Sequence, residues 1–95
     1  MVVLSYSIHY PKPEKEALLI DAMRQAGKVI KSLPGNLFDN AFQDATAGTI
    51  MAISIWESQE AFQAAMPAMR EALKDILFDE WEARPRELHL LNSLW

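Results

Sequence analysis

Hydrophobic and polar residues alternate along residues 2–10, and this alternation predicts a first β-strand. Successive side chains of a strand point to opposite faces of a sheet. One set of positions is apolar or aromatic and consists of Val2, Leu4, Tyr6, Ile8 and Tyr10. The other set is more polar and consists of Val3, Ser5, Ser7 and His9. We expect the apolar set to face the core of the protein.

Apolar residues recur every three or four positions between residues 14 and 33, which predicts an amphipathic helix. Pro13 suits its first turn, and the sequence Leu33-Pro34-Gly35 ends it. A second helix begins after Ser58, a good N-cap residue. Because proline lacks an amide hydrogen, we expect Pro67 to break or offset this helix near its middle. Its buried stripe comprises Phe62, Met66, Met69, Leu73, Ile76 and Leu77.

Two further strands are predicted at residues 37–43 and 49–57, and the turn sequence DATAG at 44–48 joins them as a hairpin. Residues 86–95 read as a last strand. The order of elements over residues 1–95 is therefore strand, helix, strand, strand, helix, strand. This order predicts a single α+β domain of the ferredoxin-like type, β-α-β-β-α-β, with a four-stranded antiparallel sheet and both helices on one face.

The helices can cover only one face of such a sheet, so the other face needs a different cover. This other face is expected to carry Ser5, Ser7, His9, Ala52, Ser54 and Trp56. The set contains too many polar residues for a core and too many apolar residues for full exposure to water. A second copy of the chain would cover them, and a chain this short is only marginally stable alone because it buries roughly 60–65 % of its surface. We therefore expect a homodimer with a cavity between sheet and helices.

Composition narrows the classes of function. The chain has no cysteine, which excludes disulfides, thiolate metal sites and a cysteine nucleophile. Its nine Lys and Arg residues are dispersed and its net charge is −4, which argues against nucleic acid as a partner. The apolar N-terminus lacks the basic start of a signal peptide, and no apolar run is long enough to span a membrane. These features favour a cytoplasmic protein. His9 and His89 lack the spacing of a metal site, so no metal is expected.

The strand end Trp56-Glu57-Ser58, followed by Glu60-Ala61-Phe62 and an amphipathic helix, resembles the antibiotic biosynthesis monooxygenase (ABM) family of dimeric α+β barrels. The exit Leu33-Pro34-Gly35 and the order of elements over essentially the whole chain do so as well. The resemblance implies a homodimer, with a pocket in each protomer between the inner face of the sheet and the helices. It also implies an oxygenase that uses O2 on quinols or anthrone-like aromatics without a cofactor.

The resemblance further implies that Trp56 and Arg70 hold the developing oxyanion of such a reaction. His9 is the candidate proton acceptor, since histidine titrates near neutral pH. The residues expected to line the substrate pocket are Ser5, Ser7, Ala52, Ser54, Phe62 and Met66. Two of them depart from the anthrone-oxidising members, which have a tyrosine at the position of Phe62 and a polar residue at that of Ala52. The haem-degrading branch is disfavoured because the second helix contains no histidine and Trp81 lies beyond the expected position.

Each candidate also has a purely structural explanation. Trp56 could fill the core or a dimer interface, since burying an indole is favourable by itself. Arg70 could be a solvated helix charge, and His9 could be exposed at its strand end. The acidic group of Asp75, Asp79, Glu80 and Glu82 reads as a solvated helix end. Two other functions therefore stay open: a non-catalytic dimer that binds a small ligand or acts as an accessory protein, and an isomerase or lyase that needs no oxygen.

Overall fold

Four antiparallel strands form one sheet in the computed structural model, which describes residues 1–95. The central strands are β1 (Val3–His9) and β3 (Thr49–Trp56), and the edge strands are β2 (Asn36–Asp44) and β4 (Glu87–Asn92). The order across the sheet is β2-β3-β1-β4. This is the ferredoxin-like α+β arrangement that the sequence predicts, and the hairpin of β2 and β3 is confirmed.

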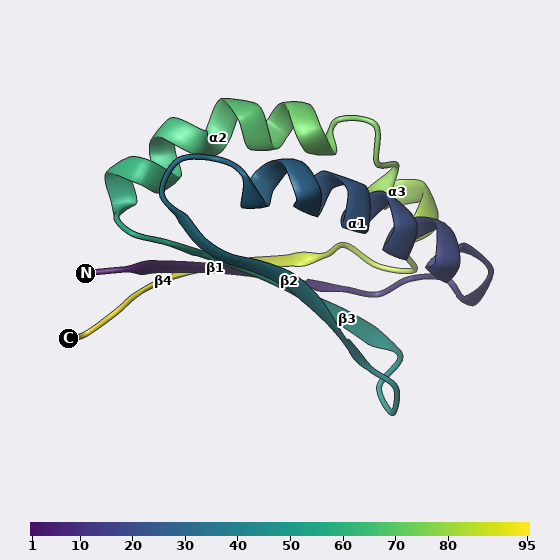
Figure 1. The fold of residues 1–95 in the computed structure, drawn as a ribbon. Helices are drawn as coiled ribbons and strands as arrows, with labels where there is room; N and C mark the ends of the chain where they lie inside the picture. The colour runs from purple at the N-terminus through teal and green to yellow at the C-terminus, as the bar shows by residue number, and fades with distance from the viewer.

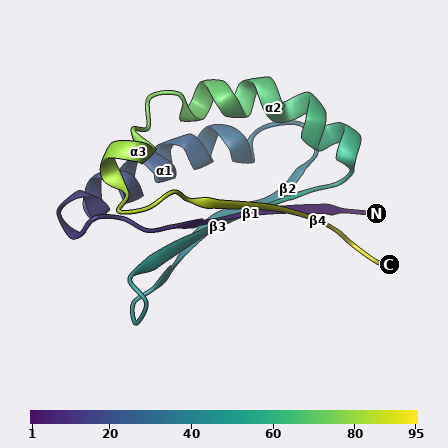
Figure 2. The same cartoon turned by 180° about the vertical axis from the view of Figure 1, so that it is seen from behind.

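Two long helices lie side by side on one face of this sheet (Figures 1 and 2). A short 3-10 turn, η1 (Pro13–Lys15), leads into α1 (Glu16–Lys31). Ser58 caps α2 (Gln59–Leu73) by accepting a hydrogen bond of 3.0 Å from the amide of Ala61, as expected. No helix has the length and apolar character needed to cross a membrane.

The second helix differs from its prediction in two ways. First, it runs unbroken through Pro67. Because Pro67 has no amide hydrogen, the carbonyl of Gln63 loses its hydrogen bond within the helix. Both residues are exposed, so this carbonyl can bond to water instead. The helix also ends at Leu73, because the chain bends before a separate short helix, α3 (Phe78–Trp81). Ile76 is buried outside any helix, whereas Leu77 is 49 % exposed and does not belong to the core.

The two faces of the sheet are the reverse of the sequence prediction. Val3 and Trp56 pack with Ile30 of α1 and Ala65 of α2 in one buried cluster. We call the helix-covered side the inner face; its residues on the central strands are Val3, Ser5, Ser7, His9, Ile50, Ala52, Ser54 and Trp56. The prediction was wrong because alternation sorts residues into two sets without showing which set the helices cover.

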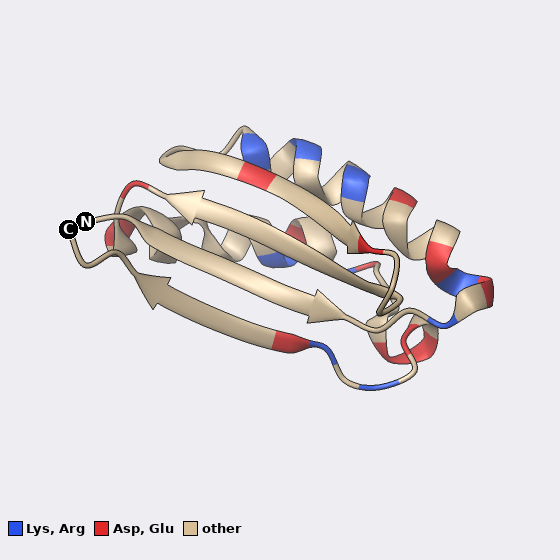
Figure 3. Cartoon of the chain, turned by 90° about the horizontal axis from the view of Figure 1, so that it is seen from below, with Lys and Arg blue, Asp and Glu red and all other residues tan.

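The side away from the helices, the outer face, is the more apolar one. It carries Leu4, Tyr6, Ile8, Phe38, Phe42, Met51, Ile53, Ile55 and Leu91. Figure 3 shows this side, and charged positions on the strands are confined to a few places at the edges. Several large side chains remain partly in water, with Phe42 49 % and Leu91 51 % exposed. Both faces of the sheet therefore bear apolar surface.

Gly35 fixes the junction at which Trp56 ends β3. Its φ of +83° is a conformation that other residues rarely adopt. Its carbonyl accepts a hydrogen bond of 2.9 Å from the amide of Glu57. A Cβ atom on Gly35 would lie 2.5 Å from that of Ala61. The glycine that ends the first helix thus also allows α2 to approach the sheet beside Trp56.

Candidate functional site

Trp56 is the largest fully buried side chain of the protein. It lies under both helices at one end of the inner face, and its neighbours include Leu33, Met69 and Phe62. The Phe62 ring meets the indole edge-on, with centroids 6.1 Å apart. The indole Nε1–H has no hydrogen-bond partner. Trp56 therefore belongs to the core and also carries an unused donor.

Asn36 brings an unused acceptor to the same end of the inner face. It is paired with Trp56 across β2 and β3, so the two side chains leave the sheet on the same side. Its Nδ2 donates to Ser54 Oγ at 3.1 Å, while its Oδ1 is buried and has no partner. Asn36 was not among the predicted site residues, because the expected strand began one residue later. A polar residue next to the Pro-Gly exit was the available signal.

The burial of Trp56 is favourable even with its donor unpaired. An indole that leaves water hides about 150–250 Å², worth roughly 4–6 kcal/mol at about 25 cal/mol per Å². An unpaired buried N–H costs about 1–3 kcal/mol. Packing therefore explains why Trp56 is buried, but it leaves a cost that a hydrogen-bond acceptor bound beside the indole would recover.

His9 lies at the opposite end of the inner face and is only 3 % exposed. Its Nε2 is 2.7 Å from Ser7 Oγ, and its Nδ1 is 2.9 Å from Glu82 Oε2. The alternative in which His9 is exposed at its strand end is therefore wrong. So is the solvated helix end predicted for Glu82, which is 5 % exposed. The sequence offered no local signal for this contact, since 73 positions separate the two residues.

The predicted site residues do not gather at one point. Ser5, Ser7, Ala52 and Ser54 are half-buried along the middle of the inner face, and Phe62 and Met66 are half-buried on α2. Trp56 and His9 are six strand positions apart, or about 20 Å. Arg70 is exposed on α2, whereas Trp56 is fully buried. Trp56 and His9 therefore cannot act on the same substrate atom.

Asp39 adds a half-buried carboxyl to the edge of the inner face. It is paired with Ser54 across β2 and β3, beneath Gly27 of α1. Burial raises the pKa of Asp39 above its usual value, while a hydrogen bond from Ser54 and the charge of Lys31 oppose the rise. A carboxyl with a raised pKa is closer to accepting a proton at neutral pH. Asp39 was not among the site residues predicted from the sequence.

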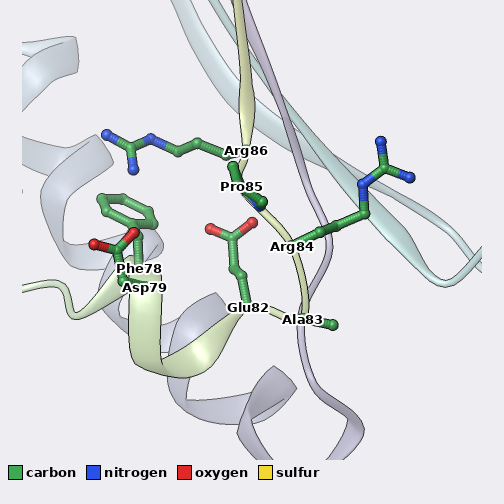
Figure 4. A pocket seen from close by; sticks show the side chains of 7 residues that line it. All are labelled: Phe78, Asp79, Glu82, Ala83, Arg84, Pro85 and Arg86. Atoms are coloured by element: carbon green, nitrogen blue, oxygen red, sulfur yellow. The ribbon is translucent and has the colours of Figure 1, made fainter.

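Trp56 lines neither of two cavities that open at the surface. One of about 270 Å³ lies between α3 and the start of β4 (Figure 4). Glu82 and Phe78 line it, together with Arg86, whose guanidinium lies 4.1 Å from the centre of the Phe78 ring. The other, of about 210 Å³, lies on the outer face beside the chain termini and is lined by Val2, Leu4, Ile55, Leu91, Asn92 and Ser93.

Comparison with protein families gives one match. The model of a family described as antibiotic biosynthesis monooxygenase matches residues 1–74, which include Asn36, Trp56 and His9 but not Glu82. No curated protein is detectably similar to the chain in sequence.

Solved structures share the fold at low sequence identity. Rv0793 from Mycobacterium tuberculosis is 16 % identical with a TM-score of 0.83, and the match covers 99 % of this chain and 96 % of that one. A conserved protein from Methanosarcina mazei is 11 % identical, with a TM-score of 0.85 and coverage of 98 % and 93 %. SnoaB, a cofactor-independent oxygenase from Streptomyces nogalater, is 13 % identical, with a TM-score of 0.81 and coverage of 99 % and 94 %.

Proposed function

The chain belongs to the antibiotic biosynthesis monooxygenase family, and on this basis we propose that it oxidises a small electron-rich aromatic, such as a quinol or an anthrone, with O2 and without a cofactor. The observation that carries the proposal is the pair of unpaired polar atoms at one end of the inner face. The Trp56 indole offers a donor, and the Asn36 amide offers an acceptor. A phenolic hydroxyl can satisfy both, because it accepts one hydrogen bond and donates another.

The same pair suits the chemistry of a reaction with O2. An electron-rich aromatic transfers an electron to O2 far more readily once it has lost a hydroxyl proton. The Trp56 N–H would then stabilise the resulting oxyanion, and it would do so strongly because the site excludes water. Phe62 and Met69 supply apolar walls for an aromatic ring. Ser5, Ser7, Ala52, Ser54 and Met66 would line the rest of the pocket along the inner face and α2.

In this proposal Asn36 takes the part that the family resemblance gave to Arg70. Arg70 is exposed on α2, whereas Asn36 is paired with Trp56. The family resemblance leads us to expect a polar side chain four residues before Trp56, where this chain has the apolar Ala52. Asn36 supplies a polar side chain near the indole from another strand.

A homodimer is part of the proposal because the outer face is an extended apolar surface. Exposed apolar patches of this kind mark protein interfaces. A second copy, related by a twofold axis, would present the same apolar strands and cover them symmetrically. Family membership supports this arrangement, since ABM-family proteins are commonly dimers.

The test is oxygen uptake by the purified protein with a panel of quinols and anthrones. We expect uptake with at least one of them, and a loss of about 10²–10³-fold in kcat for Trp56→Phe, which keeps an aromatic ring but removes the donor. Trp95→Phe is the matched control, because Trp95 is 98 % exposed at the C-terminus. A Trp56→Phe variant as active as the wild type would disprove the role of the indole.

The two other functions make different predictions in the same assay. A ligand-binding or accessory dimer is favoured by Phe62, which packs on Trp56 without a phenolic hydroxyl. It would bind an aromatic tightly in air without consuming oxygen. An isomerase or lyase would convert its substrate at the same rate under nitrogen. Either result would replace the oxygenase proposal.

A further inference from the structure

Ser7, His9 and Glu82 form a continuous chain of hydrogen bonds at the end of the inner face away from Trp56. Ser7 Oγ and His9 Nε2 are 2.7 Å apart, and His9 Nδ1 and Glu82 Oε2 are 2.9 Å apart. The histidine and glutamate side chains are only 4 % and 2 % exposed. Ser7 is half-buried, so the chain runs from a buried carboxylate to a hydroxyl on the inner face of the sheet.

Glu82 is held rigidly at the inner end of this chain. Its second oxygen, Oε1, accepts a hydrogen bond of 2.8 Å from the amide of Tyr10. The backbone on both sides of it is tied to the segment after β1, through an isolated bridge to Pro11 and a bond of 2.8 Å from the Ala83 amide to the Tyr10 carbonyl. The fold therefore fixes a carboxylate against His9.

The surroundings of His9 favour one arrangement of its proton. Phe78 stacks on the imidazole with centroids 5.5 Å apart, and the guanidinium of Arg86 lies on that phenyl ring (Figure 4). Glu82 is thus the charged group in direct contact with the imidazole. An ionised carboxylate can only accept hydrogen bonds, so in the neutral imidazole Nδ1 carries the proton and donates to Glu82, and Nε2 accepts from Ser7.

We propose that Ser7, His9 and Glu82 form a proton relay that removes a hydroxyl proton from the ligand. Ser7 Oγ accepts the proton as the O–H bond of the ligand breaks, and the proton that Ser7 already carries passes to His9 Nε2. The electron pair stays on the ligand oxygen, and the resulting imidazolium is stabilised by Glu82. Ser7 and His9 transfer the proton, and Glu82 is the positioning residue. The relay rests on the proposed function, for which it supplies the base.

The position of Ser7 agrees with this role. Ser7 is paired with Ala52 across β1 and β3, so it lies beside the one strand position where the family resemblance leads us to expect a polar side chain. It is four strand positions, or about 13 Å, from the level of Trp56. The two side chains and a ligand of two or three fused rings can bridge this distance. In an anthrone-like ligand the hydroxyl deprotonated at Ser7 would be conjugated with the oxygen held at Trp56, so the negative charge left by the relay would be shared with that oxygen.

The backbone around Ser7 argues against the alternative of a serine nucleophile. β1 is a central strand paired on both sides, so its amides are used in the sheet. They cannot form the pair of free N–H donors that acyl transfer needs for its oxyanion. The structure thus favours Ser7 as a carrier of protons.

A binding measurement with p-nitrophenol tests the relay without oxygen. The assay uses mildly acidic buffer, in which the free probe is mostly the colourless phenol. We expect wild-type protein to convert bound probe to the yellow phenolate, and Ser7→Ala to reduce that signal at least about tenfold. His9→Gln should do the same, whereas His89→Gln is the matched control, since His89 is on the outer face. No phenolate signal, or a signal that survives Ser7→Ala, would overturn the relay.

Nitrogen-15 NMR of the histidine ring tests the role of Glu82 in the protein alone. We expect the Nδ1–H tautomer of His9 in the wild type. In Glu82→Gln the new amide can donate to Nδ1, so the tautomer should switch to Nε2–H and the phenolate signal should fall. Glu80→Gln is the control, because it changes an exposed position of α3 and should leave both the tautomer and the signal unchanged. An Nε2–H tautomer in the wild type would contradict the assignment.

The outcomes separate the relay from the oxygenase. A phenolate signal that needs Ser7, in a protein that never consumes oxygen, would keep the relay and reject the oxygenase. Oxygen uptake that is unaffected by Ser7→Ala, with no phenolate signal, would do the reverse. Covalent labelling of Ser7 by a fluorophosphonate probe would show a serine nucleophile and overturn the relay.

Discussion

The Asp39 carboxyl lowers the stability of the folded protein when it is ionised. The residue is half-buried between β2 and α1, and Oδ2 lies 3.0 Å from the place of a Cβ atom on Gly27. Burial is the main cause of its raised pKa. A group whose pKa is higher in the folded protein stabilises the fold while it is protonated, and that contribution is lost as the pH rises through the folded pKa. At neutral pH the ionised Asp39 therefore destabilises the protein.

Replacing Asp39 by asparagine should raise the melting temperature at pH 7, because the amide carries no charge to desolvate. The gain should shrink as the pH falls and vanish below about pH 4, near the unfolded pKa of aspartate. Circular dichroism melts across this range measure it, with Asp75→Asn as the control because Asp75 is exposed. A melting temperature at pH 7 that is lowered by Asp39→Asn would contradict the sign.

Single residues were also where the sequence informed least about the site. Trp56 was identified from its place before Glu57 and Ser58, and His9 from its chemistry. Their partners were not, because Asn36 comes from another strand and Glu82 is 73 positions from His9. Such pairings are made by the fold, and hydrophobic spacing does not encode them.

The elements were more predictable than their surroundings. The pattern of apolar, polar and turn residues predicted all four strands, and the three-four spacing predicted both long helices, because these periods reflect backbone geometry. They did not show which sheet face α1 and α2 cover, since an apolar outer face satisfies the same pattern. The predicted break of the second helix at Pro67 was wrong, because the missing hydrogen bond costs little on the exposed side of α2.

The junction of β3 and α2 links element geometry to the site. Gly35 allows α2 to begin close to the sheet, and Ser58 caps its first turn. Both features set Trp56 under the helices, next to Phe62. The W-E-S segment therefore fixes the position of the indole, around which the proposed pocket would form.

The molecule as a whole has a helix-covered face and an apolar face that is open in the single chain. Ile53 lies in the middle of the outer face, opposite Tyr6 of β1 and Asn40 of β2. In the proposed dimer it would be buried near the twofold axis. A charge there would have to be desolvated together with its symmetry mate.

Ile53→Glu should therefore convert the dimer into a monomer, with a dissociation constant at least about 100-fold higher, equivalent to about 3 kcal/mol. Light scattering after size-exclusion chromatography gives the mass directly. Ala64→Glu adds the same charge on the exposed side of α2 and should leave the mass unchanged. A wild-type protein that elutes as a monomer at every concentration would remove the dimer from the account.

Trp56 connects these scales, because its burial stabilises the core and its free donor defines the proposed pocket. The protein has three tryptophans, so an amide-type proton–nitrogen NMR spectrum should contain three indole signals. The most direct measurement is a titration of that spectrum with an anthrone or a naphthohydroquinone under nitrogen. The signal that is missing in Trp56→Phe belongs to Trp56. We predict that this signal shifts downfield when the ligand binds and that the signal of Trp95 does not move. A Trp56 signal that stays in place while the ligand binds would contradict the site proposed for this protein.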